Sequence, residues 1–232
     1  MSKKGKKYRA ARQAIEPDRL YSLAEAVAEL KKLVFAKFNE SVELVVRLGV
    51  DPRHSDQMVR GTVSLPHGTG KTIRVIAFCG ADKVDEAQAA GADLAGSGDL
   101  IEKIKGGWTD FDVAVAEKSL MREISPLGKI LGPRGLMPSP KAGTVTDDIS
   151  SAIREVKAGR IEFKCDKFGN VQVVVGKVSF AENDLVENIQ TVMREIHRLR
   201  PASAKGKYVL KAFISSTMSP AFRLDAAELS GA

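Results

Sequence analysis

The segment Thr72-Ile-Arg-Val-Ile-Ala-Phe-Cys79 decides the fold, because it is a nearly continuous apolar run with the length of one strand. A strand that is apolar on both faces is typical of a parallel sheet covered by helices. Strand-like segments recur at residues 93–96 and 111–116, and helical patterns lie at residues 81–90, 99–105 and 119–124. This alternation predicts a small parallel sheet with right-handed crossovers.

A glycine- and proline-rich segment follows, Leu127-Gly-Lys-Ile-Leu-Gly-Pro-Arg-Gly-Leu-Met-Pro-Ser-Pro-Lys141. Glycine permits backbone angles that other residues avoid, and proline fixes φ and removes a donor. We therefore expect an ordered, sharply turning segment here, with no ordinary helix or central strand. We interpret it as the segment that closes the parallel-sheet domain. A helix from the N-cap Asp148 to residue 158, with Gly159 as its stop, is expected after it.

The segments before and after this domain share a different pattern. Residues 1–12 are rich in Lys and Arg and predict a mobile basic arm. The capping box Ser22–Glu25 predicts a helix to about residue 38, and strands are expected at 42–48 and 58–65. Farther along, residues 161–165 and 171–175 predict a hairpin around the turn 166–170. A long amphipathic helix at 182–200 and a last strand at 208–215 complete the pattern.

These patterns predict an α/β protein of two domains. A discontinuous α+β outer domain, residues 1–66 and 160–232, is interrupted by an inner domain, residues 67–159. The formal charge is +8 for the outer segments and −1 for the inner ones. The two connections, near Pro66 and Gly159, would form a double-stranded hinge.

The net charge of +7 and the pI of about 9.4 favour anionic partners. Cys79 and Cys165 are far apart and lack C-x-x-C spacing, so we expect two reduced cysteines in a cytosolic protein. No apolar run approaches the length of a membrane span, and the basic start lacks the apolar region of a signal peptide. We expect no membrane partner.

Motifs for catalysis and cofactors are weak. Gly68-Thr-Gly-Lys-Thr72 lacks the first glycine of a P-loop and precedes a strand, whereas a P-loop precedes a helix. Gly96-x-Gly98 lacks the third glycine of the dinucleotide fingerprint. The three histidines, His54, His67 and His197, show no metal-ligand spacing. We expect no enzyme activity, no cofactor and no metal. A nucleotide- or metabolite-using enzyme built on the inner sheet is the competing class.

Three outer segments suit RNA: residues 37–43, 166–170 and 215–220. They combine hydroxyls, carboxylates, an aromatic ring and a methionine with nearby Lys and Arg. The wide minor groove of duplex RNA presents 2′-hydroxyls and riboses, which such side chains can contact, and cations can contact phosphates. Three ordinary surface turns are the alternative interpretation of the same residues.

The order of four segments resembles the bacterial form of the ribosomal protein L-one family. They are Lys37-Phe-Asn-Glu-Ser-Val-Glu-Leu44, Leu65-Pro-His-Gly-Thr-Gly-Lys-Thr72, residues 128–145 of the glycine–proline region, and Ser216-Thr-Met-Ser-Pro220. The resemblance covers residues 8–224. It implies an outer domain that binds large-subunit ribosomal RNA at the mobile stalk, and a hinged, Rossmann-like inner domain. It also implies contact with exit-site transfer RNA during its release, repression of the protein's own messenger RNA, and a cytoplasmic location on the ribosome. No homo-oligomer is expected.

The resemblance also implies a set of RNA-contacting residues: Lys37, Phe38, Ser41, Glu43, Asp166, Lys167, Gly169, Thr217, Met218 and Ser219. Ser219 stands where the family usually has glycine, which puts close backbone approach to RNA in doubt there. Lys129, Arg134 and Lys141 are candidate secondary contacts to RNA or transfer RNA. A dedicated translational repressor that never enters the ribosome would show the same features.

Overall fold

The computed structural model describes residues 5–16 and 19–230, and the chain divides into two compact units. The outer unit comprises residues 1–70 and 162–232, and the inner unit comprises residues 71–161. Both contain helices and sheets, and the inner unit holds a parallel sheet, so the mixed α/β fold class is confirmed.

The outer unit is built on a four-stranded antiparallel sheet in the order β7-β1-β8-β9. Its strands are β1 (Ser41–Leu48), β7 (Asn170–Lys177), β8 (Val209–Ser216) and β9 (Phe222–Leu224). The central strand β1 comes from the N-terminal segment, whereas its two neighbours come from the C-terminal segment. The two halves of the interrupted unit are therefore joined by backbone hydrogen bonds along β1.

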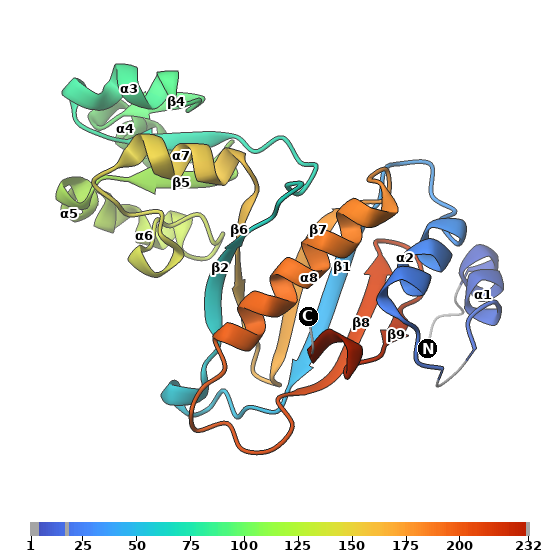
Figure 1. Cartoon of the computed structure of the whole chain (residues 1–232). Coiled ribbons are helices and arrows are strands. Elements are labelled where there is room, and N and C mark those ends of the chain that lie inside the picture. Colours follow the sequence, from blue (N-terminus) through green and yellow to red (C-terminus); the bar gives the residue numbers. More distant parts are fainter. Residues whose placement is uncertain (1–4, 17–18, 231–232) are drawn as a thin grey trace. The chain divides into compact units, whose positions relative to one another are not determined.

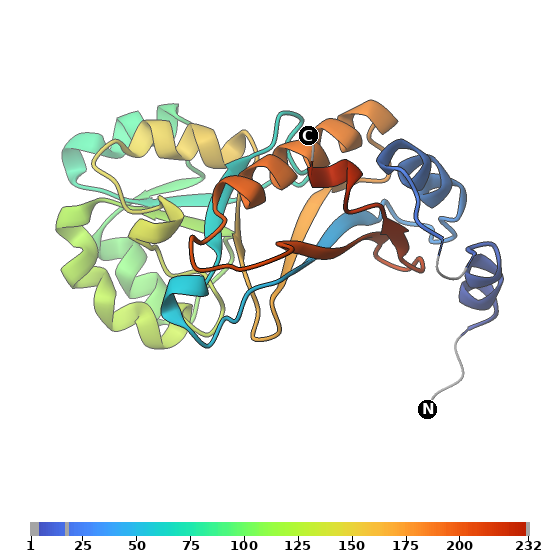
Figure 2. The same cartoon turned by 60° about the horizontal axis from the view of Figure 1, so that its bottom comes forward.

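Helices cover one face of this sheet. α2 (Leu23–Lys32) and α8 (Glu182–Arg198) contact each other and the strands, and both lie on the same side in the two views (Figures 1 and 2). Residues of β1 alternate accordingly: Val42, Leu44 and Val46 are fully buried, while the residues between them are less covered. This alternation matches the period of two in the sequence.

Two helices of the outer unit differ from the sequence-based expectation. Residues 6–13 of the basic segment form a helix, α1 (Lys6–Gln13), while residues 1–4 lie outside the described part. The α2 helix ends at Lys32 and not near residue 38, since the β-branched Val34 and the aromatic Phe35 that follow are poor helix formers. Its cap is also only half of the predicted box: Ser22 Oγ accepts from Glu25 N–H (3.3 Å), but the Glu25 carboxylate pairs with Arg19.

The predicted hairpin at residues 161–175 is wrong. β6 (Arg160–Lys164) pairs with β2 (Arg60–Ser64) in a separate two-stranded sheet, whereas β7 pairs with β1. Only the turn between them is as expected, with Asp166 N–H donating to Asn170 C=O (2.8 Å). Each of the two apolar patterns correctly predicted a strand. A pattern within one strand, however, does not tell which other strand it pairs with.

The inner unit contains the parallel sheet β4-β3-β5. Its elements are β3 (Val75–Phe78), α3 (Val84–Ala89), β4 (Leu94–Gly96), α4 (Gly98–Lys105), β5 (Val113–Ala116), α5 (Met121–Ile124), α6 (Gly128–Leu131) and α7 (Ile149–Lys157). Alternate β3 residues belong to different cores: Ile76 and Phe78 pack with α4, whereas Val75 and Ala77 pack with α7. The strand is thus buried on both faces, as the apolar run predicted. Asp148 caps α7 by accepting from Ser151 N–H (3.0 Å).

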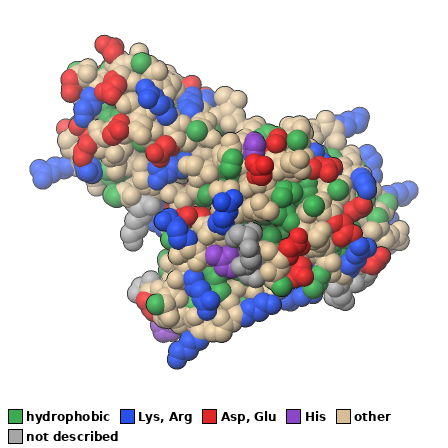
Figure 3. All heavy atoms as spheres, viewed as in Figure 1, with side chains coloured by type: hydrophobic (Ala, Val, Ile, Leu, Met, Phe, Trp, Pro, Cys, Tyr) green, Lys and Arg blue, Asp and Glu red, His purple; other side chains and the backbone are tan. Residues whose placement is uncertain are grey.

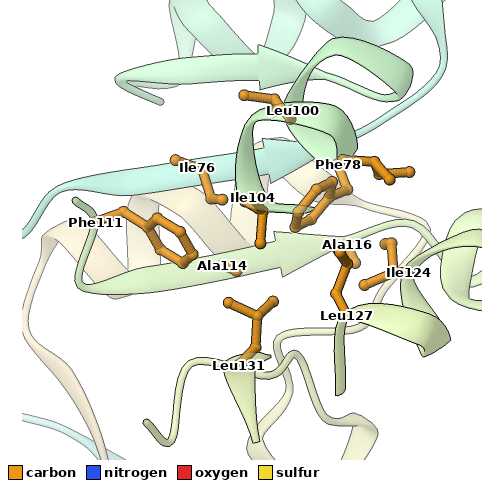
Figure 4. Packing of buried hydrophobic residues seen from close by; sticks show 11 residues of the cluster. Ile76, Phe78, Leu100, Ile104, Phe111, Ala114, Ala116, Ile124, Leu127 and Leu131 are labelled. Atoms are coloured by element: carbon orange, nitrogen blue, oxygen red, sulfur yellow. The ribbon is translucent and has the colours of Figure 1, made fainter. Parts of the chain in front are cut away.

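The glycine–proline segment forms part of the inner core. Residues 128–131 form the four-residue helix α6, a short turn of helix that the expectation of no ordinary helix did not foresee. Leu127 and Leu131 are 1% and 0% exposed and pack against β5 and α4 residues; Figure 4 shows both near Ala114 and Ala116. A Cβ atom added at Gly132 would lie 2.5 Å from the carbonyl oxygen of Gly128, which is too close for a side chain. The segment therefore closes this unit through buried leucines.

Replacing Leu131 tests that role. Leu131→Ala should lower the free energy of unfolding of the inner unit by about 2–5 kcal/mol, because a buried leucine is lost and a cavity remains. Trp108, the only tryptophan, packs against the same cluster, so its fluorescence during urea unfolding reports on this unit. The exposed Lys129→Ala control should change the value by less than about 0.5 kcal/mol. Equal effects of the two substitutions would contradict the assignment.

Candidate nucleic-acid interface

The outer sheet has an open face, which we define as the side of β7, β1, β8 and β9 opposite α2 and α8. Arg47, Lys211 and Arg223 point to this face, as does Glu43, because they alternate with the buried strand residues. By contrast, α2 and α8 carry six acidic and four basic residues, and Figure 3 shows red and blue side chains mixed on the helical side. The excess positive charge of the outer unit therefore does not come from these two helices, and part of it lies on the strands of the open face.

At one end of this face, the start of β1 is joined to the turn after β8. Ser41 N–H donates to Thr217 Oγ1 (3.1 Å), and Thr217 N–H donates to Ser41 C=O (3.1 Å). Lys177 Nζ donates to Ser41 Oγ (2.8 Å). Two of the segments predicted to contact RNA are thus brought together although they are 176 residues apart.

A buried glutamate organises this turn. Glu40 is 0% exposed, and its Oε2 accepts from Ser216 Oγ (2.5 Å) and from Met218 N–H (2.9 Å). Its Oε1 is buried without a hydrogen-bond partner among the described residues. Carboxylate hydrogen bonds of this kind are stronger than neutral ones when the acceptor is ionised. Glu40 lies within a segment that the sequence analysis selected, but its position in the core could not be recognised from the sequence.

Ser219 has a local role in the same turn. Its Oγ accepts from Ser216 N–H (3.0 Å), and the two hydroxyls are hydrogen bonded to each other (2.9 Å). The Ser219 hydroxyl therefore stabilises the turn from within. This leaves Thr217 and Met218 as its exposed residues.

Phe38 and Met218 are large apolar side chains left in solvent, 55% and 48% exposed. Lys37 is exposed beside Phe38, and Glu43 is partly exposed on β1 opposite Ser215. An apolar surface with a cation and a carboxylate next to it can contact riboses, phosphates and 2′-hydroxyls together.

The turn at residues 166–170 lies at the opposite end of β1. Asn170 is opposite Arg47 in the β1–β7 register, six residues from Ser41, or roughly 20 Å along the strand. The predicted RNA-contacting residues therefore form two clusters. The first cluster lies around Ser41 and the Thr217–Met218 turn, and the second cluster is the turn at residues 166–170. Arg47, Lys211 and Phe213, which the sequence analysis did not select, lie between them on the open face. The sequence pattern that could have identified these three residues is their alternation with buried apolar neighbours along β1 and β8.

Within the second cluster the predicted residues differ in exposure. Asp166 Oδ1 accepts from the N–H groups of Phe168 and Asn170, and Oδ2 accepts from Asn170 Nδ2 (3.0 Å). The side-chain bond to Asn170, with the backbone bonds, lowers the pKa of Asp166. Gly169 is buried against Leu48, whereas Lys167 is exposed and Phe168 is 75% exposed. Asp166 and Gly169 shape the turn, and Phe168, which the sequence analysis did not select, is its large exposed apolar side chain.

The candidate secondary contacts lie in the inner unit. Lys129 is exposed on α6, and Arg134 is exposed and hydrogen bonded to Thr109 Oγ1. The backbone of Lys141 belongs to the turn Pro140–Ala142, and its side chain lies outside the described part.

The P-loop-like segment has a structural role. His67 N–H donates to Asn188 Oδ1 (3.2 Å), and Asn188 Nδ2 donates to Gly68 C=O (3.1 Å). Asn188 is fully buried on α8, so its amide ties the glycine-rich segment to that helix. Within residues 5–16 and 19–230, no three His, Cys, Asp or Glu side chains are grouped to hold a metal ion, and no helix is long and apolar enough to cross a membrane.

The fold is that of an α/β protein whose interrupted α+β unit carries an exposed, partly basic sheet face. Residues 30–220 match the family described as "Ribosomal protein L1p/L10e family". Relatives named "Large ribosomal subunit protein uL1" include those of Kosmotoga olearia, 51% identical over 97% of both chains, and Beutenbergia cavernae, 53% identical over 98% of this chain and 96% of that one. That of Protochlamydia amoebophila is 54% identical over 98% and 97%. The chain belongs to the ribosomal protein L1p/L10e family.

Removing the buried carboxylate tests the construction of the turn. Glu40→Ala should lower the free energy of unfolding by about 1–3 kcal/mol, because the Ser216 hydroxyl and the Met218 amide lose their acceptor. The Met218 amide should also exchange faster in a hydrogen-exchange NMR experiment. Glu40→Gln, which keeps one acceptor oxygen, should lie between Glu40→Ala and the native chain. If Glu40→Ala behaved like the half-exposed control Glu43→Ala, the turn would not depend on Glu40.

Proposed function

We propose that the chain is a cytoplasmic protein of the large ribosomal subunit that binds ribosomal RNA of the mobile stalk through the open face of its outer unit. The observation that carries this proposal is the exposed Thr217–Met218 turn, held from below by Glu40 and from the side by Ser41. Membership of the ribosomal family supports the choice of RNA. Its action is binding and motion, without catalysis.

The Thr217–Met218 turn fits the surface of folded RNA better than it fits extended single-stranded RNA. Thr217 and Ser41 offer hydroxyls, and Glu43 offers carboxylate oxygens that accept hydrogen bonds from 2′-hydroxyls. Met218 and Phe38 present apolar surface for riboses and bases. Because the backbone of the turn is fixed before binding, little conformational entropy is lost on association.

The cations at both ends of the face supply phosphate contacts. Lys37 is exposed beside the first cluster, and Lys167 is exposed at the second. Arg47 lies between them on β1. Such contacts release counterions and make affinity fall as salt concentration rises. The two clusters, roughly 20 Å apart, would position one RNA fold by its shape.

The inner unit is the part proposed to meet exit-site transfer RNA. Two chain connections, at 70–71 and 161–162, join the units, and a double connection is typical of hinged motion. In this proposal the inner unit follows the stalk as deacylated transfer RNA leaves. The open face would also repress the protein's own messenger RNA by binding a copy of the ribosomal RNA site.

Truncating the turn gives the main prediction. Thr217→Ala with Met218→Ala should weaken binding of a ribosomal stalk RNA fragment by about 10- to 100-fold, because two exposed contacts of the proposed site are lost. The dependence of affinity on salt should stay the same, since no cation is removed. Fluorescence anisotropy across a salt series measures both quantities.

The matched control is Leu94→Ala, which shortens a comparably exposed apolar side chain (37% exposed) in the inner unit. It should bind the fragment as the native chain does. Unchanged affinity of the Thr217–Met218 variant, with its circular dichroism intact, would remove this turn from the RNA site.

Neutralising the inner cations tests the division of roles. Replacing Lys129, Arg134 and Lys141 with glutamine should weaken contact with deacylated transfer RNA, measured on reconstituted large subunits by filter binding. Affinity for the stalk fragment alone should change less than about twofold, since these residues lie in the inner unit. The reverse pattern would exchange the assigned roles of the two units.

A further inference from the structure

A cavity of about 210 Å³ lies in the outer unit, beside the open face at the β8–β9 edge. It is lined by residues of α1 and the chain after it, together with side chains of β8 and β9. The lining residues are Arg12, Ile15, Glu16, Arg19, Tyr21, Lys211, Phe213, Ala221 and Arg223. Neither the family resemblance nor the proposed stalk-binding residues include this cavity.

Its lining has an excess of cations. Among its described lining residues, four Lys or Arg side chains stand against one carboxylate, that of Glu16. Arg19 forms ion pairs with Glu16 and Glu25 and lies 4.8 Å from the centre of the Tyr21 ring. Arg12, Lys211 and Arg223 form no ion pair with any described residue. Like charges gathered around a cavity repel each other, and a bound anion would relieve that repulsion.

Aromatic surface accompanies these charges. Phe213 is partly exposed on the open face, directly opposite Arg223 on β9. Tyr21 is buried and packs edge-on against Phe222, with ring centroids 5.2 Å apart, so its position is fixed. Cations beside an available aromatic face suit a nucleotide, which carries a flat base and an anionic phosphate.

The cavity is continuous with the proposed RNA surface. Phe213 is opposite Val45 and Lys211 is opposite Arg47 across the β1–β8 ladder. Ser215, opposite Glu43, is two residues farther along the same strand. RNA bound along β1 would therefore pass the mouth of this cavity.

We propose that this cavity binds one unpaired nucleotide of RNA. The base stacks on Phe213, while Arg12, Lys211 and Arg223 contact its phosphate and the next one. Unpaired bases of loops and bulges are recognised in this way, by stacking and by contacts to the backbone. The proposal rests on the proposed function, because it takes the nucleotide from RNA bound to the same unit.

The test uses the full chain and a labelled single-stranded oligouridylate of about eight nucleotides, a length within the usual range for one binding domain. Phe213→Leu keeps apolar volume but removes the ring, and should weaken binding by about 5- to 150-fold with an unchanged salt dependence. Arg223→Gln should weaken binding and reduce the slope of log K against log salt by about 0.7, the value for one lost phosphate contact on a single strand.

The control Lys105→Gln removes an exposed cation of the inner unit and should alter neither quantity. Titrating Phe213→Leu with the ribosomal stalk RNA fragment as well separates failure of this site from failure of the stalk-binding turn, because the Thr217–Met218 turn is intact in that variant. Native binding by both Phe213→Leu and Arg223→Gln would overturn the proposal. A loss with Arg223→Gln alone, together with full competition by inorganic phosphate, would overturn it too by reducing the cavity to a phosphate site.

Discussion

The outer unit depends on the pairing of one strand with two strands that lie far from it in the sequence. β1 is bonded to β7 along one edge and to β8 along the other, and these neighbours lie beyond the whole inner unit. The ladders fix the register, so that Val42, Leu44 and Val46 face the helices. The same register aligns Ser41 with the end of β8 and Arg47 with the start of β7. The two candidate RNA clusters are thus products of a single set of backbone hydrogen bonds.

The first cluster combines that register with a buried carboxyl group. A carboxylate in a core is costly unless its oxygens are hydrogen bonded. Glu40 meets this need through the Ser216 hydroxyl and the Met218 amide, and in doing so it fixes the conformation of the exposed turn. Ser219 adds a further hydrogen bond from inside. A rigid turn with an exposed hydroxyl and thioether is suited to recognising a folded surface by shape.

Local patterns predicted the elements better than their partners. The alternation in β1, the Asp148 cap of α7 and the apolar stripe of α8 were confirmed because each depends on neighbours within one element. The hairpin at residues 161–175 was wrong because strand pairing is decided by distant segments. The short helix α6 was missed because burial of Leu127 and Leu131 in the inner core stabilises it. This packing outweighs the low helix propensity of the glycines around them. Thr217 and Met218 were implied by the family resemblance, whereas neither that resemblance nor the local patterns singled out Glu40, Phe168 or the cations of the open face.

The central claim is that RNA binds the open face of the outer sheet and not its helical face. Photocrosslinking of the whole chain to the stalk RNA fragment, followed by mass spectrometry of the peptides, tests it directly. Crosslinks are predicted at Phe38, Met218 and Phe168, which are exposed at the two ends of β1. Crosslinks confined to α2 and α8, or to the inner unit, would contradict the account.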